Sequence, residues 1–228
     1  MSEQKNNPLM LETKIVEMFT TREFHSLWTA AQSILLHRSF ELCAQIIFDE
    51  ACRMTGATSG YVALLSETGE ENEVLFLEAG GLSCTVNPNL PMPIRGLRAE
   101  SYHSGKTVCD NDFMNSEWIN FLPAGHVPLT NVMFSPFNIE GKTVGIMGLA
   151  NKLGDFSEQD ATLATAFGEI ASIALQNSRL INKLDETIKK LEEANEVQAN
   201  QEMRIVEIKK EVNALCSELG KDALYSEV

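Results

Sequence analysis

Histidines and cysteines are the side chains of this sequence best suited to chemistry at neutral pH. Four histidines and five cysteines occur among its 228 residues. His126 lies in the segment Gly-His-Val-Pro, and a neutral imidazole there can bind a ligand, or the iron of a haem. The simpler alternative is a loop histidine that hydrogen-bonds the backbone, and the sequence leaves both roles open.

The cysteines are scattered along the chain and differ in their suitability for redox chemistry. Cys109 precedes Asp110, and a neighbouring carboxylate disfavours the reactive thiolate, so we expect a buried structural thiol there. Cys84 has no such neighbour and is the better candidate for a redox-active or cofactor-bearing thiol. No two cysteines form a C-x-x-C motif, so the sequence indicates neither a zinc knuckle nor a thioredoxin-like site.

The composition restricts the class of protein. Hydrophobic residues make up 44% and charged residues 22% of the chain, which is typical of a globular protein with a hydrophobic core. The net charge of -14 disfavours non-specific binding to nucleic acid or to anionic lipid. The sequence contains no apolar run of membrane-spanning length and no signal-peptide core at its polar N-terminus. We therefore expect a cytoplasmic protein that binds neither nucleic acid nor membrane.

Hydrophobic periodicity predicts helices around a group of strands. Apolar residues recur at helical spacing over residues 9–36 and from Ser39 to Gly56, and Pro93 precedes a short helix that ends before Gly105. Ser157 and Asp160 form a capping-box pattern at the start of a last, long helix. Strand patterns occupy residues 61–65, 74–77, 107–109, 131–137 and 143–150. Because the strands fall into hairpins, the sequence predicts an antiparallel sheet in an α+β fold.

The last helix carries an apolar stripe with alternating steps of four and three residues. The stripe consists of Leu163, Phe167, Ile170, Ala174, Asn177, Ile181, Leu184, Ile188 and Leu191. Its first part suits a core-facing helix, and its second part predicts a coiled coil with another copy of the chain, hence a homodimer. The next stripe positions are polar, and residues 195–201 form a stutter, a splay point or a turn. We favour a continuous helix because that stretch lacks Gly, Pro and Asp.

Several separated segments resemble, in order, a large group of bacterial and archaeal GAF domains. They are residues 93–99, 112–118, 122–129, 145–152 and 167–171. The resemblance covers about residues 20–180 and implies a six-stranded antiparallel sheet. Terminal helices would pack on one face of this sheet, and loops would cover a ligand pocket on the other. Only five strands are evident from the pattern, so we expect a sixth, short strand near Leu82–Val86.

The resemblance also implies a function. GAF domains of this group are sensory modules that sit upstream of histidine kinases, cyclases and other outputs. We expect an N-terminal helical extension (residues 1–19), the GAF domain (20–180), a coiled-coil signalling helix (181–219) and a tail (220–228). The expected function is non-enzymatic two-component signalling: the module senses an unidentified small molecule and acts on a partner such as a histidine kinase. The alternative is a haem- or thiol-based redox or gas sensor that uses the same pocket.

Known chemistries of GAF relatives fit this sequence poorly. Relatives that reduce free methionine sulfoxide need clustered cysteines, and relatives that bind bilins carry a Cys-His pair; this sequence has neither. We expect no metal and no cofactor, with haem as the second choice.

The expected pocket residues follow from their places on the sheet and its covering loops. In residues 131–137, strand alternation directs Met133 and Ser135 to one face and Phe134 to the other. We assign Met133 and Ser135 to the pocket, because Ser135 is polar and a ligand needs polar contacts. The full set of pocket candidates is Phe76, Cys84, Leu97, Tyr102, Trp118, His126, Met133, Ser135 and Met147.

Overall fold

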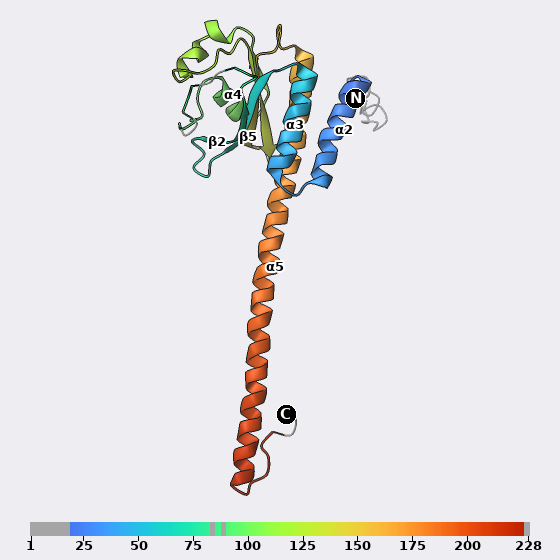
Figure 1. Cartoon of the computed structure of the whole chain (residues 1–228), viewed down its shortest axis with the longest axis vertical. Coiled ribbons are helices and arrows are strands. Elements are labelled where there is room, and N and C mark those ends of the chain that lie inside the picture. Colours follow the sequence, from blue (N-terminus) through green and yellow to red (C-terminus); the bar gives the residue numbers. More distant parts are fainter. Residues whose placement is uncertain (1–18, 83–84, 88–89, 226–228) are drawn as a thin grey trace, which may run out of the picture. The chain divides into compact units, whose positions relative to one another are not determined.

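The computed structural model describes residues 19–82, 85–87 and 90–225 (Figure 1). The chain divides into two compact units, residues 1–178 and 179–228. The first unit contains a sheet with helices, and the second contains the distal part of the long helix α5 (Glu158–Glu218) and the segment after it. None of the described helices combines the length and the hydrophobicity that crossing a bilayer requires.

The described strands form one antiparallel sheet in the order β2-β1-β5-β4-β3. Their bounds are Ser59–Leu65 (β1), Asn72–Glu78 (β2), Val108–Asp110 (β3), Val132–Ile139 (β4) and Lys142–Ala150 (β5). The described residues thus give five strands, and the expectation of six is wrong for this part of the chain. Of the segment expected to form the sixth, Leu82, Thr85 and Val86 lie in no strand, and Ser83 and Cys84 lie outside the described residues.

Helix α2 (Thr21–Leu36) begins later than the periodicity predicts. Thr20 is its N-cap: the Thr20 hydroxyl accepts a hydrogen bond from the Glu23 backbone, and the Glu23 carboxylate accepts one from the Thr20 N–H. This reciprocal capping box requires an extended backbone at Thr20, which has φ -67° and ψ 161°. A single helix over residues 9–36 is therefore wrong, because the helix cannot continue through Thr20. Residues 9–18 of that prediction lie outside the described residues.

The main core lies between the sheet and the helices α3 (Phe40–Thr55) and α5. Figure 1 shows α3 and the first part of α5 on one side of the sheet, with α4 (Leu97–Ser104) on the other. The largest fully buried side chains here include Ile47, Phe48, Val62, Met133, Phe137, Met147, Leu149, Leu163 and Phe167. The expected α+β fold with terminal helices on one face of the sheet is confirmed.

A network of polar side chains fixes the start of α5. The Ser157 hydroxyl accepts a hydrogen bond from the Asp160 N–H, and the Asp160 carboxylate accepts one from the Ser157 N–H, as the capping-box pattern predicts. The buried Asp160 also forms an ion pair with Lys152. Burial raises the pKa of Asp160, but the hydrogen bonds from Lys152 and Ser157 outweigh it and hold that pKa below its ordinary value.

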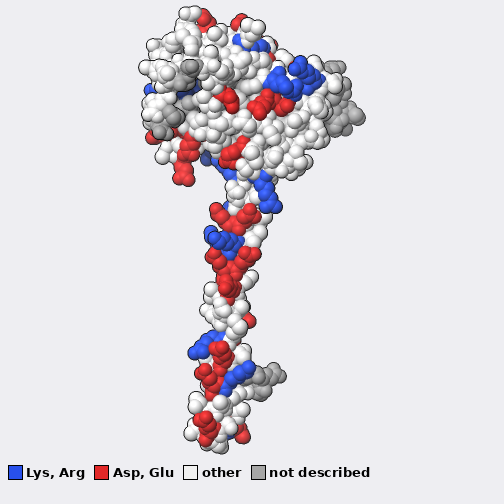
Figure 2. Space-filling model, viewed as in Figure 1, with Lys and Arg blue, Asp and Glu red and all other residues white. Residues whose placement is uncertain are grey.

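Helix α5 continues without interruption through residues 195–201, which confirms the continuous helix. In the second unit its stripe residues are uncovered: Leu184, Ile188 and Leu191 are 59%, 44% and 59% exposed. Acidic side chains gather on the visible surface of this helix (Figure 2). At its end, Asn213 Oδ1 accepts hydrogen bonds from the backbone N–H groups of Leu224 and Tyr225, which returns the chain onto the helix.

Candidate ligand-binding cavity

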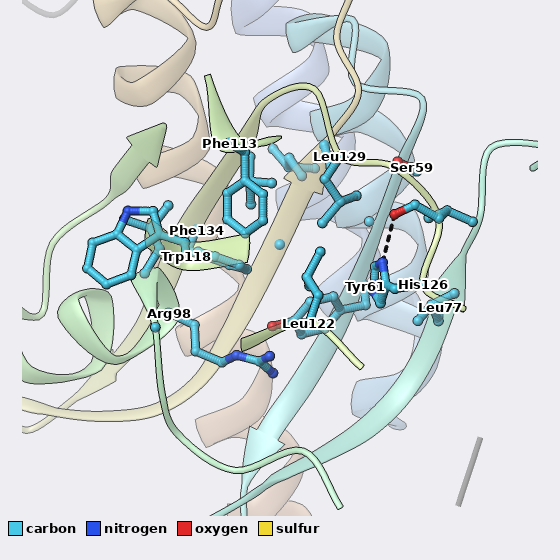
Figure 3. Close-up of a pocket in the computed structure, with 18 of the residues that line it drawn as sticks. Ser59, Tyr61, Leu77, Arg98, Phe113, Trp118, Leu122, His126, Leu129 and Phe134 are labelled. Carbon is cyan, nitrogen blue, oxygen red and sulfur yellow. Dashed lines mark hydrogen bonds between the residues drawn. The ribbon is translucent and has the colours of Figure 1, made fainter. Parts of the chain in front are cut away.

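A cavity lies on the face of the sheet opposite α3 and α5. It encloses about 90 Å³, less than the roughly 150 Å³ of an engineered apolar cavity that binds benzene. Strands β1, β4 and β5 form one wall, the start of α4 forms a second, and the loop that connects β3 to β4 covers it. The side chains that point into it include Ser59, Tyr61, Arg98, Phe113, Trp118, Leu122, His126, Leu129 and Phe134 (Figure 3).

Glycine in the central strand lets two aromatic rings meet at the wall of the cavity. Tyr61 on β1 and Phe134 on β4 have ring centroids 6.2 Å apart across β5. A Cβ atom at Gly148 would lie 2.9 Å from the Tyr61 ring and 3.0 Å from the Phe134 ring. Such contacts are too close for carbon atoms, so a glycine is needed between the rings.

The covering loop is held in place by its own short helical turns and by α4. The turns η1 (Phe113–Asn115) and η2 (Glu117–Phe121) carry the aromatic residues that close the cavity. The Arg95 guanidinium lies 6.0 Å from the Phe121 ring centroid and donates a hydrogen bond to the Phe121 carbonyl. The cover is therefore tied to the segment that begins α4.

A hydrogen bond to the backbone shows which ring nitrogen of His126 carries a proton. Its Nδ1 lies 2.8 Å from the Val127 carbonyl oxygen, which can only accept a hydrogen bond, so Nδ1 carries the proton. Nε2 of a neutral His126 is then an acceptor at the cavity wall. The hydrogen bond to the backbone predicted by the simpler alternative is present, and a ligand contact through Nε2 stays a prediction.

Four buried polar atoms lack hydrogen-bond partners within the part of the chain that the structure describes, and three of them belong to residues that line the cavity. They are Ser59 Oγ, Tyr61 Oη, Asn72 Nδ2 and Arg98 Nη1. Each buried, unpaired polar group costs about 1–3 kcal/mol, and such groups are uncommon in folded proteins. Their concentration around one cavity indicates a site that receives polar atoms from a ligand or from water.

The pKa values of Tyr61 and Tyr102 depend on their burial and on the nearby Arg98 guanidinium. Burial raises the pKa of Tyr61, and the adjacent Arg98 guanidinium opposes this effect. Burial also raises the pKa of Tyr102, whose hydroxyl donates a 2.6 Å hydrogen bond to Asn72 Oδ1. Both phenols are therefore protonated near neutral pH and available as hydrogen-bonding groups.

Comparison with known families assigns the fold. The family model for the GAF domain matches residues 37–176. The chain belongs to the GAF domain family. GAF domains are regulatory sensor modules, generally without catalytic activity. No curated protein matches the sequence.

Solved structures agree with this fold. The GAF domain of an Acinetobacter phosphoenolpyruvate-protein phosphotransferase has a TM-score of 0.60 at 16% identity, over 72% of this chain and 98% of that one. Free methionine-R-sulfoxide reductase from Neisseria meningitidis has a TM-score of 0.58 at 17% identity, covering 70% and 91%. Residues 122–287 of a methyl-accepting chemotaxis protein give a TM-score of 0.52 at 11% identity, covering 67% and 98%.

The structure brings three of the predicted pocket residues to the cavity of this GAF domain. Leu97, Trp118 and His126 line it, and their contact with a ligand remains a prediction. Tyr102 packs beside the cavity without being among its lining residues. Cys84 lies outside the described residues.

The other four predicted residues face the opposite side of the sheet, so their expected placement is wrong. Met133 and Met147 are fully buried in the core under α3 and α5, and Phe76 packs its ring against Phe48 of α3 at 5.4 Å. The Ser135 hydroxyl donates a 2.7 Å hydrogen bond to the Ala164 carbonyl of α5. The polarity of Ser135 therefore serves a helix contact, and Phe134 is the β4 residue at the cavity.

Three residues that line the cavity are not among the predicted pocket residues: Tyr61, Arg98 and Phe134. Arg98 follows the predicted Leu97 within a segment that resembles GAF domains, and this position was the available signal for it. For Tyr61 the signal was the alternation of β1, in which Ser59 and Tyr61 face the cavity while Val62 faces the helices.

Three of the described cysteines, Cys43, Cys52 and Cys109, have raised thiol pKa values and are poorly suited to redox chemistry. Burial, Asp49 and Glu78 raise the pKa of Cys52 to about 12. Cys109 is exposed, contrary to the expected burial. Desolvation and then Asp110 raise its pKa, which agrees with the prediction that it is not an activated thiol.

The structure does not fit a bound haem or metal ion. Within the described ranges, no group of three or more His, Cys, Asp and Glu side chains could hold a metal ion. The cavity of about 90 Å³ is smaller than the engineered cavity that holds a single benzene ring, so a porphyrin does not fit it as its side chains are placed.

Proposed function

We propose that this GAF domain is a ligand-sensing regulatory module whose cavity is coupled to helix α5 through strand β4. The observation that carries this proposal is the placement of two consecutive residues. Phe134 lines the cavity on one face of β4, and Ser135 on the other face donates its hydrogen bond to the Ala164 carbonyl of α5. A ligand that displaces the Phe134 ring would therefore act on the strand that holds the helix.

The close packing of α5 against β4 supports this coupling. Gly168 faces Ser135 so closely that a Cβ atom there would lie 2.4 Å from the Ser135 hydroxyl oxygen and 2.8 Å from the Pro136 carbonyl oxygen. With no side chain between strand and helix, a shift of β4 cannot be absorbed by a rotamer change. By linkage, a ligand shifts the helix only if it binds two arrangements with different affinities.

The proposed output is a homodimer that signals to a protein partner of two-component type, such as a histidine kinase. The uncovered stripe of Leu184, Ile188 and Leu191 supports pairing of α5 with a second copy, because a heptad-spaced apolar stripe is stabilised by packing against another helix. The continuity of α5 from the sheet contact through Glu218 supports transmission along it. We place this signalling in the cytoplasm.

A catalytic role is not part of the proposal. Although one structural relative is a methionine sulfoxide reductase, no cysteine is among the described residues that line the cavity. Those residues also bring no pair of carboxylates together for general acid–base catalysis, because Glu78 is the one acidic residue among them.

A variant that fills the cavity tests the ligand-sensing role. Leu129→Trp adds volume at the cavity wall, whereas the control Leu35→Trp adds the same side chain at a position 87% exposed on α2. A library of small metabolites would be screened by thermal unfolding of the wild type and both variants. We expect at least one compound to raise the Tm of the wild type and of Leu35→Trp only. A library without such a compound, or one whose active compounds act equally on Leu129→Trp, would refute the role.

A further inference from the structure

Arg98 is half-buried and places a positive charge, with one buried nitrogen, at the cavity of an acidic protein. The chain carries a net charge of -14, yet Arg98 forms no ion pair with any carboxylate among the described residues. Its Nη1 atom is buried and unpaired, and its side chain extends toward Tyr61 in Figure 3. A guanidinium stays protonated at every physiological pH. Partial burial of a charge without a partner has a cost, so a ligand that supplies a counter-charge would stabilise this site.

The acidic residue that lines the cavity directs its side chain to the other face of the sheet. Glu78 lines the cavity, but it pairs with Gly60, whose Cβ position would contact Phe48 on the helix side of the sheet. Its carboxylate also raises the pKa of Cys52 in α3. Since neighbouring positions of paired strands share a face, the Glu78 side chain lies on the helix side and does not neutralise Arg98.

The unpaired groups near Arg98 are hydrogen-bond donors. The Tyr61 hydroxyl and the Asn72 side-chain amide nitrogen have no partners among the described residues. Asn72 receives the Tyr102 hydroxyl on its oxygen, which leaves its NH₂ group to donate. The Tyr61 hydroxyl beside the Arg98 guanidinium forms a site for an acceptor that carries negative charge.

The remainder of the cavity is apolar. It is surrounded by the apolar side chains of Phe113, Trp118, Leu122, Leu129 and Phe134. The space of about 90 Å³ suits a molecule of few atoms. A planar carboxylate matches a single guanidinium through two parallel hydrogen bonds. A phosphate dianion carries more charge and more acceptor oxygens than one arginine and one hydroxyl can satisfy in an apolar surrounding.

We infer that the ligand of this cavity is a small organic carboxylate with a short aliphatic body. Arg98 and Tyr61 bind its carboxylate, and the aromatic side chains of β4 and the covering loop enclose its body. This inference rests on the proposed ligand-sensing function and specifies the chemical class that the site selects.

Matched acids and amides test the inference. Propionate and isobutyrate, with propionamide and isobutyramide as neutral isosteres, would be titrated into the full chain at pH 7 by calorimetry and ligand-observed NMR. The variants are Arg98→Met, which keeps an unbranched apolar stem without the charge, and Tyr61→Phe, which removes only the hydroxyl. The control Arg22→Met removes an exposed charge on α2. Unfolding curves of each variant establish that it is folded, and Tyr61→Phe serves as the reporter if Arg98→Met does not fold.

We expect at least one acid to bind at millimolar concentration or better and to raise the Tm. A lost charge-assisted hydrogen bond corresponds to about a tenfold or greater loss of affinity, so we expect that loss for the matching amide and for Arg98→Met. Tyr61→Phe should weaken binding of the acid severalfold, and Arg22→Met should leave it unchanged.

Different experimental results would contradict the carboxylate assignment and the proposed ligand-sensing function. Amides that bind as well as acids, or acids whose binding is unchanged in both Arg98→Met and Tyr61→Phe, would overturn the carboxylate assignment. Acids that do not bind would overturn it too, even when a library compound stabilises the wild type and not Leu129→Trp. Only the absence of any compound acting through the cavity would refute the proposed function itself.

Discussion

Replacing Gly168 by alanine tests the contact that links the sheet to α5. In an exposed helix interior, Gly→Ala stabilises by about 1 kcal/mol. At Gly168 the new Cβ would lie 2.4 Å from the Ser135 hydroxyl oxygen and 2.8 Å from the Pro136 carbonyl oxygen. Overpacking of a buried site costs about 1–3 kcal/mol, and here one neighbour is backbone that no rotamer change can move. We therefore expect Gly168→Ala to lower the free energy of unfolding by about 1 kcal/mol, after the helix-propensity gain is included.

A second substitution separates the two contacts. Ser135→Ala alone removes a buried hydrogen bond of 2.7 Å to Ala164 and should cost about 1 kcal/mol. In the double variant the closer of the two contacts is gone, whereas the contact with the Pro136 carbonyl oxygen remains. The double variant should therefore be more stable than the sum of the single effects predicts, by a coupling energy of about 1 kcal/mol.

Urea unfolding followed by tryptophan fluorescence measures these values. Trp28 and Trp118 both belong to the first unit of the chain, so the signal reports on that unit. Glu169→Gly, at the neighbouring exposed position of α5, is the control for helix propensity and should cost about 0.5–1 kcal/mol. A Gly168→Ala variant as stable as the wild type would refute the close packing of β4 on α5 and, with it, the proposed coupling.

Three further predictions concern the second unit, the start of α5 and a buried thiol. Leu184→Asp with Leu191→Asp should convert the proposed dimer into a folded monomer, because each places a charge in the apolar stripe; light scattering would show half the mass, and an unchanged mass would refute the dimer. The stabilisation from Asp160, whose pKa is lowered in the folded state, is fully present above its ordinary pKa of about 4 and lost as the pH falls further. Acid unfolding of Asp160→Asn should lack this component, and an acid transition identical to that of the wild type would argue against it. Cys52, with a pKa of about 12, should resist alkylation at pH 8 until the protein unfolds, so rapid labelling of the folded chain at this residue would contradict its burial.

The sequence predicted the elements because their signals are local. The 3–4 spacing of apolar residues located α3 and α5, and the Ser157–Asp160 pair located the start of α5. The absence of helix-breaking residues was sufficient to predict the continuity of α5 through residues 195–201. The prediction failed at Thr20, because its capping box interrupts an apolar periodicity that continues on both sides.

The face of β4 could not be predicted from the sequence. Alternation separates Met133 and Ser135 from Phe134, but it does not say which set meets the helices. We assigned the polar residue to the ligand, whereas Ser135 instead satisfies a helix carbonyl at 2.7 Å. Assigning one residue of a strand to the wrong face assigns every other residue of that strand to the wrong face as well. Met133 and Ser135 were therefore misplaced together.

What distinguishes the two faces physically is where each polar group finds its partner. Ser135 and Asp160 have hydrogen-bond partners within the chain, and both hold α5 in place. Tyr61 and Arg98 have buried polar atoms with no such partner among the described residues. Burying these atoms without a hydrogen bond lowers the free energy of unfolding. A fold that retains this cost at one cavity gains stability when a ligand supplies the missing acceptor, because a molecule that binds only the folded state adds its binding free energy to that of folding. The unpaired donors of Tyr61 and Arg98 are therefore the feature that separates the ligand-binding face of this sheet from its structural face.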